Sequence, residues 1–183
     1  RVPDDARPGD YRGKVTVTAR DREPVDVPVE LRVVDWRVPA PSQFMSFLDF
    51  IQSPQSVAMH YGVEMWSDAH WKLLDRTFRL LGEAGNDTLW ITAQRQTHLG
   101  NEHAMIRFRR EGGKLVPDLD IAERYLATAL EHMGRIRVLT LYGYRCPWGA
   151  GMHYGRHASN DLPILITVVG PDGKLEKAEG PKW

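Results

Sequence analysis

Three stretches of this sequence, 51–66, 94–117 and 143–183, combine aromatic rings with amide, histidine and charged side chains. Aromatic rings give flat apolar surfaces for the C–H faces of a sugar ring, and a few placed polar groups match its hydroxyls. A phosphate ligand fits less well, because no Gly-rich loop followed by Lys-Ser or Lys-Thr is present. These stretches predict a carbohydrate ligand, with the alternative that the aromatic residues only pack long loops onto the scaffold. The candidate substrate-binding residues are Asp49, Tyr61, Trp66, Gln94, His98, Tyr144, Arg145 and Trp148.

A second kind of chemistry could come from Cys146, His153 and His157, which lie close together in the sequence. The two histidines are spaced i, i+4, as zinc ligands on a helix would be. Glycines at 149, 151 and 155 disfavour a helix there, and no His-Glu-x-x-His pattern occurs. We therefore favour a packed or solvated loop, and we expect neither a metal nor another cofactor.

Hydrolytic chemistry by side chains alone has few candidates. No Gly-x-Ser-x-Gly nucleophile motif is present. Asp49 and Glu64 could form a carboxylate pair acting on a glycosidic bond. We favour a structural role for both, Asp49 at a strand end and Glu64 near a helix entrance, and we assign no catalytic residue within the chain.

Composition excludes several classes of partner. The 24 basic residues cancel the 24 acidic ones, which argues against a nucleic-acid-binding arm or a polybasic membrane surface. No apolar run approaches the ~18 residues of a membrane span. Cys146 is the only cysteine, so no disulfide can form within the chain, and one thiol says little about the compartment.

The first part of the chain has the pattern of extended structure. "YRGKVTVTA" and "VDVPVELRVV" alternate apolar and polar residues and predict an antiparallel hairpin. Two strands alone are marginal in water, so this hairpin should pair with strands upstream of Arg1 or dock on the segment that follows it. We expect three segments: 1–38 as strands of a first domain, 39–43 as a linker, and 44–183 as the start of a second domain.

The second part alternates strands and helices. Strands are predicted at 44–50, 87–93 and 136–142. One helix should start at the N-cap Ser67 and end near Gly82, and another should run from Asp118 or Asp120 to Met133. Hairpins are predicted over 105–116, turning at Gly112 and Gly113, and over 164–179.

The strand–helix alternation predicts an α/β fold with a parallel sheet. Three parallel strands with two crossover helices leave a bare sheet edge, whereas a closed β/α barrel takes ~250 residues. We therefore expect the first three β/α units of an incomplete TIM-type barrel, in a piece of a longer protein. The long stretches named above would be its βα loops, where such folds carry their sites.

Several stretches resemble a known family in the order in which they appear. They are "DARPGDYRGKVTVTA", "VPVELRVVDWRVPAP", "YGVEMWSDAHW", "GNDTLWITA" and "GKLVPDLDIAERYLATALEHMGRIRVLTLYGY". Together they are similar to the glycoside hydrolase family 123 group, which comprises β-N-acetylgalactosaminidase-like proteins. The resemblance runs across most of the chain.

The resemblance implies a β-sandwich, with 1–38 as its last strands, followed by a catalytic barrel that cleaves N-acetylhexosamine-containing glycans. In such enzymes the 2-acetamido group of the sugar attacks the anomeric carbon, an Asp orients it, and an adjacent Glu acts as acid/base. Neither order of an adjacent Asp/Glu pair occurs in this sequence, so we expect the pair beyond Trp183 and the chain alone to be inactive.

The expected partners are a glycan or amino-sugar substrate and the remainder of the same chain. The resemblance to this family also suggests an exported protein, extracellular or periplasmic. The alternative function is a non-catalytic carbohydrate-binding or adhesion module.

Overall fold

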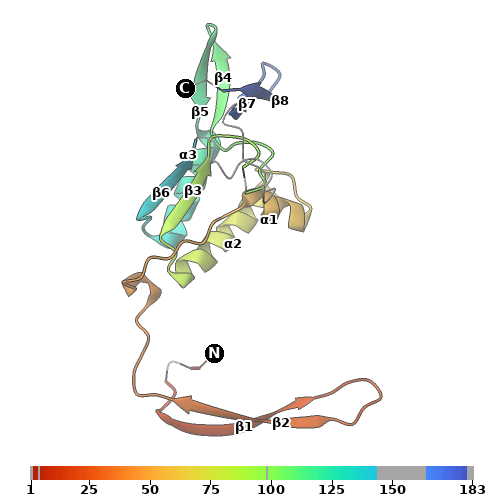
Figure 1. Cartoon of the computed structure of the whole chain (residues 1–183), viewed down its shortest axis with the longest axis vertical. Helices are drawn as coiled ribbons and strands as arrows, with labels where there is room; N and C mark the ends of the chain where they lie inside the picture. The colour runs from red at the N-terminus through yellow and green to blue at the C-terminus, as the bar shows by residue number, and fades with distance from the viewer. Residues whose placement is uncertain (1, 4, 98, 144–163, 181–183) are drawn as a thin grey trace, which may run out of the picture. The chain divides into compact units, whose positions relative to one another are not determined.

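The computed structural model describes residues 2–3, 5–97, 99–143 and 164–180, and Figure 1 shows its elements. The chain divides into two units, Arg1–Ala40 and Pro41–Trp183. Each unit is described by itself.

The first unit is the predicted antiparallel hairpin of β1 (Gly9–Val17) and β2 (Val25–Val33). Its register places Val15 opposite Val27, and Tyr11 opposite Leu31, so the apolar side chains share one face. The other face carries three cross-strand ion pairs, Asp10–Arg32, Arg12–Glu30 and Lys14–Asp26. The apolar face is exposed along almost its whole length.

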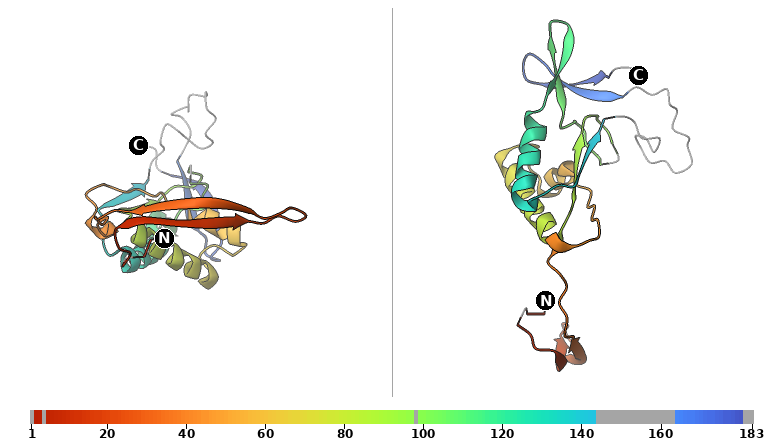
Figure 2. Two further views of the ribbon diagram at one scale, coloured as in Figure 1. Left: turned by 90° about the horizontal axis from the view of Figure 1, so that it is seen from below. Right: turned by 90° about the vertical axis from the view of Figure 1, so that its left-hand side faces the viewer.

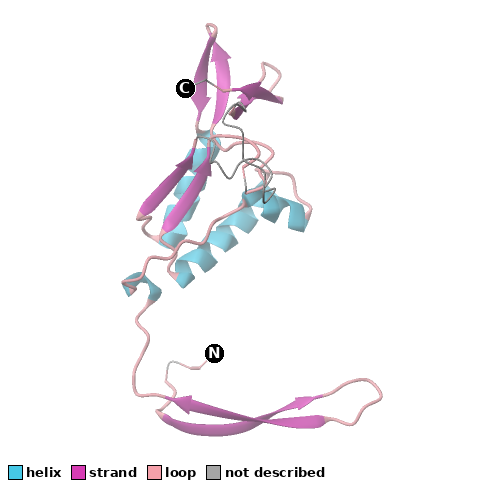
Figure 3. Cartoon of the chain, in the orientation of Figure 1, coloured by secondary structure: helices cyan, strands magenta, loops and turns pink. Residues whose placement is uncertain are grey.

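The described residues of the second unit form two sheets and three α-helices, coloured by type in Figure 3. β3 and β6 form a parallel pair, and the other four strands form a sheet of order β5-β4-β7-β8. Its elements are the 3₁₀ turn η1 (Pro41–Gln43), α1 (Pro54–Tyr61), α2 (Asp68–Ala84), β3 (Thr88–Thr92), β4 (Arg107–Glu111), β5 (Lys114–Asp118), α3 (Asp120–Met133), β6 (Val138–Tyr142), β7 (Leu165–Val169) and β8 (Leu175–Glu179).

The two long helices begin and end close to the positions that the sequence predicts. The hydroxyl of Ser67 accepts the backbone N–H of His70, so Ser67 is the N-cap of α2, and Gly85 ends the helix in the left-handed region. α3 starts at Asp120, whose N–H is accepted by Oδ1 of Asp118 over 3.3 Å.

Helices α2 and α3 lie on the same face of the β3–β6 pair (Figure 2, right). Their apolar stripes meet Leu89 and Ile91, which point from β3 toward the helices. The core cluster consists of Trp71, Leu74, Phe78, Leu89, Ile91, Met105, Ala122, Tyr125 and Ala129. This burial is the main stabilisation of the unit, since it removes apolar area from water at about 25 cal/mol per Å².

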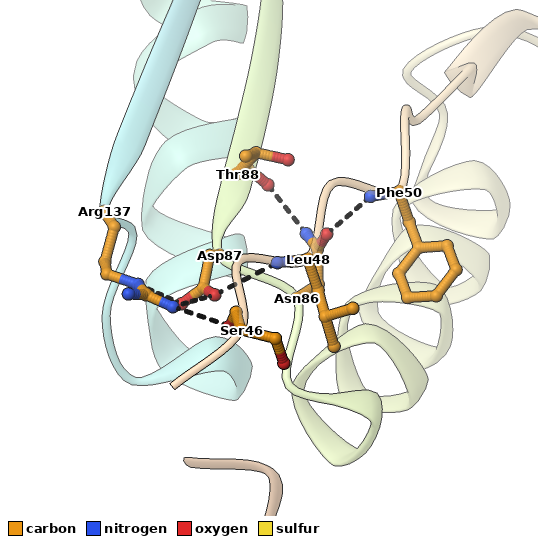
Figure 4. Close-up of polar contacts among 7 residues, drawn as sticks. All are labelled: Ser46, Leu48, Phe50, Asn86, Asp87, Thr88 and Arg137. Carbon is orange, nitrogen blue, oxygen red and sulfur yellow. Dashed lines mark hydrogen bonds and ion pairs between the residues drawn. The ribbon is translucent and has the colours of Figure 1, made fainter. Parts of the chain in front are cut away.

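Segment 44–50, predicted as a strand, is extended but forms no regular strand. One backbone bond joins it to the start of β3, from the N–H of Asp87 to the carbonyl of Leu48 over 2.9 Å. Two further contacts use side chains (Figure 4): the N–H of Leu48 donates to Asp87 Oδ2 over 3.3 Å, and that of Phe50 donates to Asn86 Oδ1 over 2.8 Å. Because these carboxylate and amide oxygens replace the carbonyls of a strand ladder, the apolar pattern alone could not reveal the difference.

An ion pair fastens the same segment to the amino end of β6. Arg137 donates to both oxygens of Asp87, over 2.7 and 2.5 Å, and to the carbonyl of Ser46 over 3.1 Å. The guanidinium holds the pKa of Asp87 below its ordinary value, and Asp87 raises the pKa of Arg137 in turn. One arginine therefore joins β3, β6 and segment 44–50.

Two features were not predicted. Helix α1 occupies half of the stretch 51–66 that we expected to be a loop. In addition, the two predicted hairpins form one sheet, because β4 pairs in parallel with β7. The mixed α/β class is confirmed, whereas the barrel and the sandwich remain proposals.

The face and edge of β6 are only partly covered by the described residues, with Val138, Leu139 and Leu141 each more than 40% exposed. Among those same residues, no helix is both long and apolar enough to cross a membrane.

Candidate functional site

A small pocket opens at the carboxyl end of β3. It has room for about one water molecule, and its wall combines aromatic, thioether, hydroxyl, amide and imidazole groups. The lining residues are Ser53, Pro54, Gln55, Met65, Trp66, Thr92, Leu99, Asn101, His103 and Met105. We call it the Trp66 pocket. Carboxyl strand ends are where β/α folds place their ligands, so this is the candidate site.

Trp66 has an unusual backbone for a bulky residue, with φ of 65°. Its N–H donates to Nδ1 of His70 over 3.0 Å, and its ring packs against Trp71 and Tyr125 at centroid distances of 5.4 and 6.4 Å. These contacts hold the strained conformation, and strain of this kind gathers at functional sites.

His70 is fully buried beneath this tryptophan. Because Nδ1 accepts the N–H of Trp66, the ring proton is on Nε2, which lies 3.1 Å from the carbonyl oxygen of Pro54 and donates to it. Burial lowers the pKa of His70, so the ring is neutral at pH 7. His70 fixes Trp66 against the first turn of α1.

The loop after β3 is held by one amide. Nδ2 of Asn101 donates to the carbonyls of Gln94 and His103, over 2.9 and 3.1 Å, and its Oδ1 accepts from the N–H and hydroxyl of Thr97. Asn101 is buried, so these bonds are shielded from water. The loop therefore presents His103 to the pocket in a fixed position.

His103, in the pocket wall, has a buried Nδ1 with no hydrogen-bond partner among the described residues. Burial and the charges of Arg95 and Arg107 lower the pKa of His103, while Glu102 opposes them. The ring is neutral at pH 7 and can donate or accept a hydrogen bond from a ligand.

Asp49 lies elsewhere, beside the amino end of β3. Its Oδ1 accepts from the hydroxyl of Thr88 and, over 3.0 Å, from the indole N–H of Trp90. The Trp90 ring is 6.2 Å from that of Tyr142. This group occupies the face of β3 and β6 opposite the helices.

The structure brings together only part of the predicted site. Trp66 lines the pocket, whereas Gln94 contacts the pocket wall through its backbone carbonyl, which accepts from Asn101. Tyr61 is exposed at the end of α1, and Asp49 belongs to the separate Trp90 group. The other four predicted residues, His98, Tyr144, Arg145 and Trp148, lie outside the described residues.

Sequence reasoning did not select His103 and Asn101. Both lie in stretch 94–117, whose composition predicts a ligand-binding loop, but nothing in the local pattern tells which of its polar groups point inward.

No cluster of three or more possible metal ligands occurs in the part of the chain that the structure describes. The candidate zinc residues Cys146, His153 and His157 fall outside that part.

A parallel strand pair covered by helices on one face, with an aromatic pocket at the strand ends, is typical of ligand-binding β/α domains. The chain matches the family described as glycoside hydrolase 123, catalytic domain, over residues 52–173. It therefore belongs to glycoside hydrolase family 123, and every residue of the Trp66 pocket lies within the matched part.

Among solved structures, the chain is similar to a family 123 glycoside hydrolase from Clostridium perfringens, described in connection with glycolipid glycan hydrolysis. The TM-score is 0.71 at 17% identity, over 98% of this chain and 31% of that one. This likeness shows the fold, and the chain spans less than a third of that hydrolase. No curated protein matches the chain.

Proposed function

We propose that the chain supplies part of the ligand-binding face of a glycosidase that acts on N-acetylhexosamine-containing glycans. The match of residues 52–173 to a glycoside hydrolase catalytic domain carries this proposal. The position of the Trp66 pocket at the carboxyl end of β3 supports it, since ligands bind at that edge in β/α folds.

The proposed mechanism is substrate-assisted and retains the anomeric configuration. The sugar's acetamido oxygen attacks the anomeric carbon while an acid protonates the leaving oxygen, and the same group then activates water. The chain contains no adjacent Asp/Glu pair to do this work. In our proposal that pair is in another part of the protein, and this chain contributes binding groups only.

Trp66 and His103 are the proposed contacts of the pocket. Trp66 offers a ring surface to a sugar, and Nδ1 of His103 offers a hydrogen bond to a hydroxyl or amide. Tyr61, Gln94, His98, Tyr144, Arg145 and Trp148 remain proposed contacts of the substrate. For Asp49 we propose an indirect role, in which its carboxylate orients the Trp90 ring.

The proposed architecture is the first part of a β/α barrel. The exposed apolar residues of β6 support this, because an edge strand of that kind needs a neighbour. In the same way, the exposed apolar face of the β1–β2 hairpin supports a place in a β-sandwich, whose second sheet would cover it.

Two matched aryl glycosides test the proposed function: a 2-acetamido-2-deoxy-β-galactoside and the β-galactoside that lacks the acetamido group. The longer protein that contains this chain should hydrolyse only the first, and NMR should show the β-anomer as the initial product. The 183-residue chain alone should be inactive. Hydrolysis of both substrates at similar rates would contradict acetamido participation, and binding without any turnover would favour the adhesion module.

A further inference from the structure

Two arginines at the base of the β4–β5 hairpin share one carboxylate oxygen. Terminal nitrogens of Arg107 and Arg109 each lie 3.2 Å from Oδ2 of Asp118. The Asp118 side chain is only 1% exposed, and its Oδ1 already accepts the N–H of Asp120 at the start of α3. Asp118 can therefore neutralise one of the two guanidinium groups, and the cluster keeps one positive charge.

The two arginines retain unused donors. Nε of Arg107 is buried and has no partner among the described residues, although a buried donor without a partner is costly. The side chain of Arg109 is 52% exposed and makes its one described bond through a terminal nitrogen. A guanidinium carries five N–H donors, so both groups can bind a further acceptor.

This surplus charge lies next to the Trp66 pocket. Arg107 follows Met105 of the pocket wall by two residues, at the point where the N–H groups of Met105 and Ile106 both donate to the carbonyl of Thr92. Arg107 also contributes, together with Arg95, to the low pKa of His103. A negatively charged group at this place would be attracted by the net positive charge of Arg107, Arg109 and Asp118.

We propose that Arg107 and Arg109 form a subsite for an oxyanion, a carboxylate or a sulfate ester, carried by a glycan that binds over the mouth of the Trp66 pocket. Guanidinium groups bind such oxyanions through paired, charge-assisted hydrogen bonds, which a neutral sugar cannot match. The glycan itself rests on the proposed function, whereas the oxyanion site does not require turnover. The enzyme would then favour acidic over neutral glycans.

Calorimetric titration with sodium sulfate and, separately, sodium acetate at constant ionic strength tests the subsite without any substrate. The protein should bind at least one of the two ions saturably, and the ion bound would distinguish a sulfate from a carboxylate subsite. Arg109→Gln should weaken the binding about ten-fold, the effect of one charge-assisted bond. Arg110→Gln is the matched control: it removes the same charge from the adjacent residue of β4, which points to the opposite face, and it should leave the affinity unchanged.

An NMR titration of the His103 imidazole adds a second readout. An anion bound beside it should raise the pKa of His103, and Arg109→Gln should abolish that rise. Absence of saturable binding by either ion would overturn the proposal, as would equal losses for Arg109→Gln and Arg110→Gln. Arg107→Gln is only a supplementary variant, because loss of the Arg107 contact with buried Asp118 can also affect folding. Arg109→Gln is therefore the variant that tests the proposal.

Discussion

The backbone N–H of Trp66 and Nδ1 of His70 are 3.0 Å apart, and the other ring nitrogen of His70 is 3.1 Å from the carbonyl oxygen of Pro54. One neutral imidazole thus satisfies a donor before α2 and an acceptor in α1. Through this bridge the helix that precedes the pocket and the tryptophan that lines it are held in one arrangement.

Replacement of His70 by Phe should destabilise the fold, because it keeps an aromatic ring but removes both ring nitrogens. The Trp66 N–H and the Pro54 carbonyl would both lose their partner, and each buried unpaired group costs about 1–3 kcal/mol. We expect a loss of about 2 kcal/mol or more in urea unfolding. His60→Phe, at an exposed position of α1, is the control and should stay within about 0.5 kcal/mol. Equal effects of the two substitutions would argue against the bridge.

The same histidine predicts how stability depends on pH. Its pKa is lowered in the folded state, so below the unfolded value of about 6.5 the unfolded chain binds a proton that the folded chain does not. The free energy of unfolding should be highest above this pH and decrease as the pH falls through it. The pKa of His103 is also lowered, so both histidines contribute to the pH dependence of stability. The contribution of His70 is the part of the slope that is lost in His70→Phe. An unchanged slope in the variant would contradict the prediction.

Asn86→Ala should release segment 44–50 from β3. The buried amide accepts the N–H of Phe50 over 2.8 Å and donates to the carbonyl of Thr88 over 2.7 Å. Loss of both bonds should cost about 1–3 kcal/mol. Hydrogen exchange should show a faster amide at Phe50, whereas the amide of Trp71 inside α2 should keep its protection. Uniformly faster exchange would mean that the whole unit had been weakened instead.

Gly82→Ala should disturb the crossing of α2 and α3. A methyl group at this position would overlap the carbonyl oxygen of His132 and lie 3.0 Å from its carbonyl carbon, both of which are backbone atoms that cannot rotate away. Overpacking of this kind costs about 1–3 kcal/mol, more than the gain in helix propensity. Gly13→Ala, where a Cβ meets no atom within 4 Å, is the control for thermal unfolding. A stabilised Gly82→Ala protein would show that the helices can move apart.

His103→Gln tests the pocket as a binding site. Its buried Nδ1 has no described partner to lose, so stability should change by less than about 0.5 kcal/mol. If the ring contacts the substrate, kcat/KM should fall about ten-fold, the worth of one hydrogen bond. His60→Gln should leave kcat/KM unchanged. A parallel loss of stability and activity would instead assign His103 a structural role.

Elements with a strong local pattern were predicted from the sequence. The stripe of Trp71, Leu74 and Phe78 gave α2, and Gly112 with Gly113 gave the turn of the β4–β5 hairpin, where both residues have positive φ. Helix α1 was missed because only Pro54 and Ala58 are buried, too few to form a periodic pattern. Its caps were the available signals, Ser53 before Pro54 and Gly62 in the left-handed region.

The sequence indicated the kinds of side chain in the candidate site better than it indicated which residues form the site. Trp66 and Gln94 were selected because aromatic and amide groups clustered in the long stretches, and both belong to the pocket region. His103 lines the pocket in a loop that Asn101 holds by donating to the carbonyls of Gln94 and His103. This arrangement has no periodic signature in the sequence. Similarly, the Arg107–Asp118 contact depends on the register of β4 and β5.

The parallel pairing of β4 with β7 also constrains the order of assembly during synthesis. The N–H of Ala104, beside the pocket, donates to the hydroxyl of Thr167 over 2.9 Å, and Phe108 pairs with Val168. During synthesis, Thr167 and Val168 leave the ribosome long after β3 and α2. The segment around Ala104 therefore lacks these partners until β7 has been synthesised. Translation pauses placed before residue 167 would therefore prolong a protease-sensitive state around Ala104.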